Sequence, residues 1–148
     1  QALTDGLTGL LNRAGWDQLA SSRDSRNRRY GNSTAILIID LDDLKLVNDR
    51  SGHAAGDDII MRAASALKQA SRADDIVARL GGDEFGIIGD NCDIAAGEAL
   101  CGRVNILLQQ LGVSASVGLA MANAGTSISS AMTLADKQMY EQKRSKKF

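Results

Sequence analysis

Gly81-Gly82-Asp83-Glu84-Phe85 stands between two apolar runs, residues 76–80 and residues 85–89, and this arrangement is typical of a β-hairpin. The paired glycines predict the reversal of the chain, because glycine adopts positive φ at little cost. Asp83 and Glu84 are then expected at the exposed tip of the hairpin. Taken alone, the stretch would also be explained as an ordinary solvated turn.

A second acidic strand end is predicted in Ala35-Ile36-Leu37-Ile38-Ile39-Asp40-Leu41-Asp42. The continuous apolar run is typical of a central strand that is buried on both faces. Because strand side chains alternate, Asp40 and Asp42 are expected to point to the same side, with the Leu41 carbonyl between them. A polar strand end that enters a turn is the alternative explanation. Two acidic strand ends in one chain favour a metal-held phosphate site.

The ligand chemistry favours Mg²⁺ or Mn²⁺ as the cofactor, because these ions prefer carboxylate and carbonyl oxygens. A zinc site is not expected. Cys92, Cys101 and the lone His53 do not form a plausible set of four ligands.

Length and composition indicate one compact domain over residues 1–148. The chain is 44% hydrophobic and 24% charged, with a net charge of −1. The near-neutral charge and the scarcity of aromatic residues argue against a nucleic-acid-binding surface. No apolar run approaches the roughly 20 residues that cross a bilayer, so no membrane contact is expected of this domain.

The cysteine pattern favours a reducing compartment, because the two cysteines form neither a disulfide-rich pattern nor a Cys-x-x-Cys motif. We therefore expect a cytoplasmic domain. Because the sequence begins at Gln1 rather than Met, we expect a piece of a longer signalling protein. That longer protein would carry the sensor segments and could itself be membrane-anchored.

Helices are expected to alternate with the strands. Asn12 can cap a helix that runs to about residue 29, and Asp93 can cap another. Apolar residues at helical spacing indicate two more helices, in residues 57–70 and 128–144, and residues 113–121 are expected to form a strand. Helices interleaved with strands and one hairpin predict an α/β or α+β fold whose sheet has mixed strand direction.

Further motifs follow one another along the chain, and together with the acidic strand ends they resemble the GGDEF family of diguanylate cyclases. The match runs nearly end to end, through residues 5–13, 40–49, 52–57, 81–85, 116–120 and 135–143. The resemblance implies a palm-like mixed sheet flanked by helices, similar to the palm domains of nucleotidyl cyclases and polymerases. It also implies the roles of residues that follow.

The resemblance implies that two metal ions in each half-site assist attack by a 3′-hydroxyl on an α-phosphate, with release of pyrophosphate. The implied ligands are Asp40, the Leu41 carbonyl, Asp83 and Glu84, and the firmest side-chain ligands are Asp40 and Glu84. Asp83 is either a metal ligand or the base that deprotonates the hydroxyl, and the sequence does not separate these roles. Asp42 could simply brace the loop.

Lysines are expected to neutralise the triphosphate, because the chain has no Gly-x-x-x-x-Gly-Lys-Ser/Thr loop. Lys45 follows the first acidic segment, and Lys143 and Lys147 lie one helical turn apart. Lys143 matches the family's phosphate-binding lysine, whereas Lys147 stands where the family commonly has arginine. Lys146 replaces a common glycine. We class Lys146 with the solvated residues of a basic helix end, as we do Lys137 and Arg144.

Asn48 and Asp57 are expected to select guanine. A carboxylate can accept from guanine N1 and N2, and an amide supplies both a donor and an acceptor. These positions contact guanine in the resembled family. The alternative role for Asp57 is the N-cap of a helix that begins near Asp58.

Arg72 and Asp75 match the family's inhibitory site, where the cyclic di-GMP product is gripped by Arg and Asp. The arginine fork suits bidentate contacts. A solvated helix exit explains the same charges, since this pair of residues is a weak motif by itself.

The implied function is diguanylate cyclase activity, in which two GTP molecules become cyclic di-GMP and two pyrophosphates. Since each 3′-hydroxyl attacks the other nucleotide, the active species is expected to be a two-fold symmetric homodimer. One alternative is a noncatalytic regulatory module that binds GTP or cyclic di-GMP. A second is an enzyme that makes another cyclic dinucleotide, which Asp57 counts against.

Overall fold

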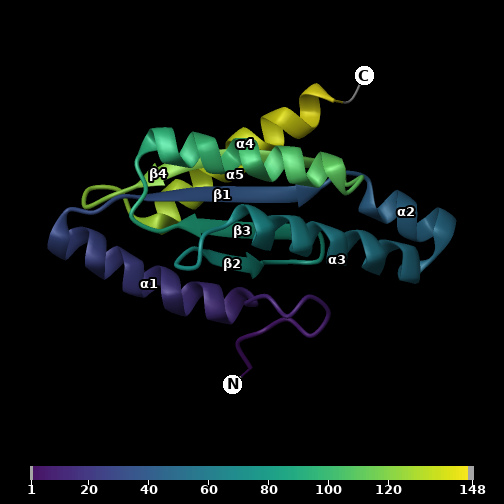
Figure 1. Ribbon diagram of the computed structural model, residues 1–148, viewed down its shortest axis with the longest axis horizontal. Helices are drawn as coiled ribbons and strands as arrows, with labels where there is room; N and C mark the ends of the chain where they lie inside the picture. Colours follow the sequence, from purple (N-terminus) through teal and green to yellow (C-terminus); the bar gives the residue numbers. More distant parts are fainter. Residues whose placement is uncertain (1, 147–148) are drawn as a thin grey trace.

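The computed structural model describes residues 2–146, in which helices lie on both faces of one sheet (Figure 1). The elements in chain order are α1 (Arg13–Tyr30), β1 (Thr34–Leu41), α2 (Leu44–Ser51), α3 (His53–Ala70), β2 (Ile76–Arg79), β3 (Glu84–Gly89), α4 (Ile94–Gln110), β4 (Ala115–Ala122) and α5 (Ile128–Ser145). This arrangement confirms the palm-like α+β fold with flanking helices. No helix of the described residues is long and apolar enough to span a membrane.

The strands form a four-stranded sheet in the order β2-β3-β1-β4. All of their pairings are antiparallel, so the strand directions are simpler than the mixed sheet that we expected. One parallel contact exists at the edge of the sheet, an isolated bridge between Leu11 and Ala78. The central strand β1 pairs with both β3 and β4, as its continuous apolar sequence predicts.

The predicted hairpin of β2 and β3 is confirmed, but its turn differs from the prediction. Neither Gly81 nor Gly82 has positive φ. The strands end at Arg79 and resume at Glu84, and the amides of Leu80 and Gly81 both donate to the Glu84 carbonyl. Because this connection is longer than a two-residue loop, the chain reverses without left-handed residues at the glycine pair.

The two faces of the sheet carry separate apolar clusters. On one face, Leu37, Ile39 and Phe85 pack with buried residues of α3 and α4. On the other face, Ile36 and Ile38 pack with Trp16 of α1 and with buried residues of α5. Alternate residues of β1 thus enter alternate clusters, which is the period of a strand that is covered on both sides.

The helix boundaries confirm two predicted caps and correct a third. The side chain of Asn12 accepts from the Gly15 amide at the start of α1, and Asp93 accepts from Ala96 at the start of α4. Asp57 is not an N-cap, because α3 begins four residues before it and follows Gly52. The short helix α2 was not predicted, and Gly52, at a φ of 88°, separates it from α3.

Helix α5 lies close against β4, and side chains of α5 bind the outer edge of that strand. A Cβ atom at Gly118 of β4 would overlap the Ala135 carbonyl oxygen of α5. The side-chain oxygens of Gln138 and Gln142 accept hydrogen bonds of 2.8 and 2.7 Å from the amides of Leu119 and Val117. These contacts fix α5 along the edge of the sheet and bring its last turns to the carboxyl end of β1.

Candidate active site

The two acidic strand ends meet, as the sequence predicts. Asp40 of β1 is the direct register partner of Glu84 of β3. Residues that are directly opposite in an antiparallel pair point to the same face of the sheet and lie close together. The Leu41 amide donates to the Asp83 carbonyl at 2.9 Å, which fixes the hairpin tip against the end of β1.

The close approach of these carboxylates disfavours their ionised forms. Burial, followed by the charge of Asp83, raises the pKa of Asp40 to about 6, although Lys143 opposes the shift. Burial and the negative charge of Asp136 raise the pKa of Glu84, and Arg13 opposes that shift. A site in which like charges are held together in this way favours an added cation.

Lys143 of α5 supplies a positive charge at the end of β1. Its Nζ atom donates to the Leu41 carbonyl at 3.0 Å. The same atom lies 3.7 Å from Oδ1 of Asp40 and 3.3 Å from Oδ1 of Asp42. The ammonium group therefore contacts two of the ligands that the sequence assigns to a metal ion.

Asp42 braces the loop, as the alternative interpretation had it. Its carboxylate accepts hydrogen bonds from the hydroxyl groups of Ser114 and Ser116 and from Nζ of Lys146. Burial alone would raise the pKa of Asp42, but these hydrogen bonds together lower it. With its oxygens engaged in this way, Asp42 holds the end of β1 against β4 and α5.

The donor set at this strand end fits Mg²⁺ or Mn²⁺ in its chemistry. Asp40, Glu84 and the Leu41 carbonyl offer hard oxygen atoms. Oδ1 of Asp40 is buried without a hydrogen-bond partner, as expected of an oxygen kept for another ligand. Within residues 2–146, no three His, Cys, Asp or Glu side chains converge closely enough to hold a metal ion as they stand. A cation held at this strand end would therefore draw on the Leu41 carbonyl oxygen as well as on carboxylates.

Arg79 holds the acidic turn in place, a role that the sequence analysis missed. Its guanidinium donates to the carbonyl oxygens of Gly81 and Gly82, and it pairs with Asp5 at 3.2 Å. The Asp5 carboxylate also accepts from the amide and hydroxyl of Thr8. The Asp-x-x-Thr spacing was a local signal of this cluster, but nothing in the sequence paired it with Arg79.

A small cavity adjoins Glu84. It has a volume of about 300 Å³, and the residues that line it are Arg13, Ile38, Glu84, Ser129, Met132, Thr133 and Asp136. A second cavity, of about 250 Å³, lies beside the last turn of α5. The residues that line this second cavity, which we call the lysine cavity, are Asp42, Asp43, Ser114, Lys143 and Lys146.

The lysine cavity contains one of the predicted phosphate-binding lysines. Lys143 lines it, whereas Lys45 lies exposed in the first turn of α2 and Lys147 lies outside the described residues. Lys146, which we had classed as solvated, donates to Asp42 at 2.9 Å and to the Ala115 carbonyl at 2.7 Å. Sequence reasoning missed Lys146 because its partners lie far away in the chain, 104 and 31 residues before it.

Asn48 of α2 lies against α3 at Gly56, one residue before Asp57. Gly56 leaves room for the Asn48 amide, because a Cβ atom at Gly56 would overlap its Oδ1 atom. That oxygen is buried and has no hydrogen-bond partner. Asp57 follows Gly56 and is exposed, and His53 is an exposed residue in the first turn of α3. The Asn48 amide thus packs against the backbone of Gly56, the residue before Asp57 in α3.

Arg72 and Asp75 are close together, but only one of them is free to reach a ligand. Both oxygens of Asp75 accept backbone hydrogen bonds, from the amides of Arg72 and Asp90, and the side chain is 1% exposed. The guanidinium of Arg72 donates to the Asp90 carbonyl at 2.9 Å, yet the side chain is 55% exposed.

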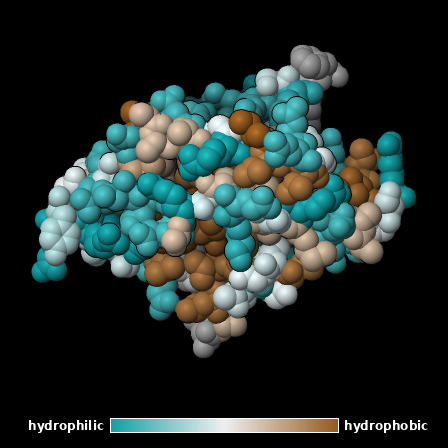
Figure 2. Space-filling model, viewed as in Figure 1, coloured by the Kyte–Doolittle hydropathy of each residue, from teal (hydrophilic) through white to brown (hydrophobic). Residues whose placement is uncertain are grey.

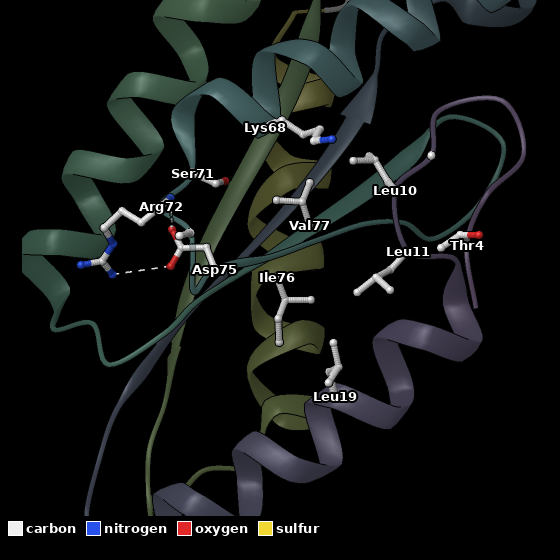
Figure 3. A pocket seen from close by; sticks show the side chains of 12 residues that line it. Thr4, Leu10, Leu11, Leu19, Lys68, Ser71, Arg72, Asp75, Ile76 and Val77 are labelled. Carbon is white, nitrogen blue, oxygen red and sulfur yellow. Dashed lines mark hydrogen bonds and ion pairs between the residues drawn. The ribbon is translucent and has the colours of Figure 1, made fainter. Parts of the chain in front are cut away.

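Arg72 lies at the edge of a cavity of about 430 Å³ beside β2 (Figure 3). Leu10, Leu11, Leu19 and Val77 give this cavity apolar walls. Apolar groups are also visible on the surface in this region (Figure 2).

Comparison with known proteins shows the family to which this chain belongs. A family model described as "Diguanylate cyclase, GGDEF domain" matches residues 2–147. The chain therefore belongs to the GGDEF diguanylate cyclase family. It is 35% identical over 151 residues to the diguanylate cyclase DgcS of Shewanella oneidensis, covering 98% of this chain and 51% of that protein. It is 30% identical to the diguanylate cyclase DgcP of Pseudomonas aeruginosa, covering 97% of this chain and 23% of that protein. The chain thus spans about half or less of the length of these relatives.

Solved structures show the same fold. The GGDEF domain of DgcB from Caulobacter crescentus, in complex with c-di-GMP, matches with a TM-score of 0.91 and 28% identity, over 98% of this chain and 92% of that one. The diguanylate cyclase SiaD of Pseudomonas aeruginosa, in complex with its activator SiaC, matches with a TM-score of 0.91 and 29% identity, over 97% of this chain and 59% of that one.

Proposed function

We propose that this domain is an active diguanylate cyclase that condenses two GTP molecules into cyclic di-GMP and releases two pyrophosphates. The observation that carries the proposal is the pairing of Asp40 with Glu84 beside the Leu41 carbonyl and the Lys143 ammonium. Oxygen ligands for a divalent cation and a positive charge for phosphate thus lie at one strand end. In each transfer, a 3′-oxygen bonds to the α-phosphorus of the other GTP, and the bond from that phosphorus to the leaving pyrophosphate breaks.

Mg²⁺ or Mn²⁺ would be held by Asp40, the Leu41 carbonyl, Asp83 and Glu84, with two ions in each half-site. When bound, such ions lower the pKa of an attacking hydroxyl and neutralise charge on the transferring phosphate. Asp83 is exposed at the hairpin tip, so its carboxylate can either bind metal or accept the 3′-hydroxyl proton.

The triphosphate is expected in the lysine cavity. Lys143 and Lys146 both line this cavity, and their ammonium groups can neutralise the β- and γ-phosphates. Lys45 and Lys147 are further proposed phosphate contacts. The exposed carboxylate of Asp57 and the side-chain amide of Asn48 are the proposed guanine contacts.

The proposed active species is a homodimer, because each hydroxyl must attack a nucleotide that is held by the other domain. Each domain would bring one GTP to the shared interface. The hairpin tip is exposed, so it is accessible to a second half-site.

Product inhibition remains a proposal for the Arg72 region. The exposure of the Arg72 fork supports it, and Arg72 is one of the residues that line the cavity of about 430 Å³. Asp75, in contrast, would have to release its backbone hydrogen bonds before it could contact cyclic di-GMP. Unchanged cyclic di-GMP binding by an Arg72→Ala variant would contradict this part of the proposal.

The test is to incubate the chain with GTP and Mg²⁺ over a wide series of protein concentrations and to identify the products by mass spectrometry. We expect cyclic di-GMP to rise more steeply than protein concentration, and we expect no product from Asp40→Asn. Binding of GTP without product at any concentration would indicate a regulatory module. Cyclic products from ATP in preference to GTP would indicate the other class of cyclase.

A further inference from the structure

The Lys143 ammonium group contacts two oxygen atoms that a metal ion would need as ligands. Its Nζ atom is 3.0 Å from the Leu41 carbonyl oxygen and 3.7 Å from Oδ1 of Asp40. That Asp40 oxygen is buried and accepts no hydrogen bond, so the ammonium charge is its nearest compensation among the described residues. An ammonium group and a metal ion cannot both fill the space between these two oxygens.

The ammonium group also has a second place to go. Lys143 lines the lysine cavity, and its side chain is 19% exposed, so it is not locked in the protein interior. Lys146 lines the same cavity, and it gives Asp42 a contact that does not depend on Lys143. A triphosphate in this cavity offers Lys143 charged oxygens in exchange for Leu41 and Asp40.

We propose that Lys143 is an internal cation that competes with the divalent metal for Asp40 and the Leu41 carbonyl, and that the triphosphate of GTP relieves this competition. The inference rests on the proposed function for the identity of the nucleotide. Metal then binds weakly to the empty domain and more tightly when phosphates hold Lys143. Because coupling between two ligands is reciprocal, metal also strengthens GTP binding through the same side chain.

The first test measures Mn²⁺ binding to the nucleotide-free chain by electron paramagnetic resonance. The proteins compared are wild type, Lys143→Met and Lys137→Met, an exposed lysine of the same helix that serves as the matched control. We expect Lys143→Met to bind Mn²⁺ about five-fold more tightly or better, within the usual range of such couplings, and Lys137→Met to be unchanged. Measurement near about pH 8 keeps Asp40 ionised, so that proton competition does not mask the effect.

The two binding affinities of the variant should move in opposite directions. Lys143→Met is expected to bind GTP more weakly while it binds Mn²⁺ more tightly, which general destabilisation would not produce. Mn²⁺ affinity that is equal or weaker in a folded Lys143→Met protein overturns the inference.

A second test needs no folded variant of Lys143. Lysine ammonium resonances of the wild-type chain are followed by NMR while Mg²⁺ is added without nucleotide. We expect the hydrogen-bonded ammonium signal of Lys143 to shift or to be lost, and an unchanged signal at saturating Mg²⁺ overturns the inference. Neither test depends on turnover. Tighter Mn²⁺ binding by Lys143→Met, together with no cyclic di-GMP from the wild type, would refute only the proposed function. Product formation by the wild type, together with unchanged Mn²⁺ affinity in Lys143→Met, would refute only the role of Lys143.

Discussion

Replacing Asp40 by Asn should make the metal-free domain more stable while it abolishes activity. Burial and the neighbouring carboxylates raise the pKa of Asp40 from 3.8 to about 6. The folded chain therefore binds this proton more tightly than the unfolded chain does. The resulting stabilisation is complete below about pH 4 and is lost as the pH rises through about 6. At neutral pH the ionised side chain is thus held at a cost to folding.

The magnitude follows from the shift. A shift of about two pKa units corresponds to about 3 kcal/mol, since each unit is worth about 1.4 kcal/mol. The Asn variant also loses the contact with Lys143, and the carboxylates titrate together, so we expect a net gain of about 1–2 kcal/mol near pH 8. For a domain of this size the melting temperature should rise by roughly 2–4 °C for each kcal/mol.

The assay is urea and thermal unfolding of metal-free protein between about pH 5 and pH 8, with Asp42→Asn as the matched control. Asp42 lies two residues away, but hydrogen bonds to its charged form lower its pKa. The control should therefore lose stability, by about 1–3 kcal/mol, because its donors lose their charged acceptor. An Asp40→Asn protein that is less stable than wild type near pH 8, or whose advantage does not change with pH, would refute the reasoning. Added Mg²⁺ should stabilise the wild type but not Asp40→Asn.

Three further changes test other parts of the site and fold. Arg79→Ala and Asp5→Asn should each lower cyclase kcat with little change in GTP affinity. Because both residues act on one turn, the kcat of the double variant should be no lower than that of Arg79→Ala, and additive losses would contradict this. Gly118→Ala should lower the free energy of unfolding by about 2 kcal/mol in urea titrations, since its new Cβ meets the Ala135 carbonyl, and a neutral effect would show that α5 can shift. Asp57→Ala should weaken GTP binding, measured calorimetrically, far more than ATP binding, and equal losses would remove Asp57 from base selection.

Local patterns in the sequence were sufficient for much of the fold. The apolar run that ends at Asp40 predicted a central strand, and the caps at Asn12 and Asp93 predicted two helix starts. These signals depend on neighbours within a few residues, so they survive in the folded chain. The meeting of the two acidic strand ends is of another kind, because Asp40 and Glu84 lie on β1 and β3, which pair in the sheet although α2, α3 and β2 separate them in the chain.

The missed contacts join residues that are far apart in the sequence. Arg79 and Asp5 are 74 positions apart, and Lys146 and Asp42 are 104 positions apart. Each residue has an ordinary charge in an ordinary place, so no periodicity marks it. The turn at Gly81 and the start of α3 were predicted wrongly for a different reason. Glycine favours positive φ, but the longer connection between β2 and β3 does not need it. Aspartate favours N-cap positions, but α3 has already begun four residues before Asp57.

The position of Lys143 depends on how α5 runs along the edge of the sheet. Gln138, Gln142 and Lys146 are spaced four residues apart, and they bind Leu119, Val117 and Ala115 of β4 in turn. Four helical residues rise about 6 Å and two strand residues rise about 6.7 Å, so the helix and the strand stay in step over these contacts. The same contacts satisfy backbone groups on an edge strand that could otherwise pair with another chain. Lys143, one residue after Gln142, is thereby directed at the Leu41 carbonyl, so that edge protection and the charge of the active site depend on the same turns of one helix.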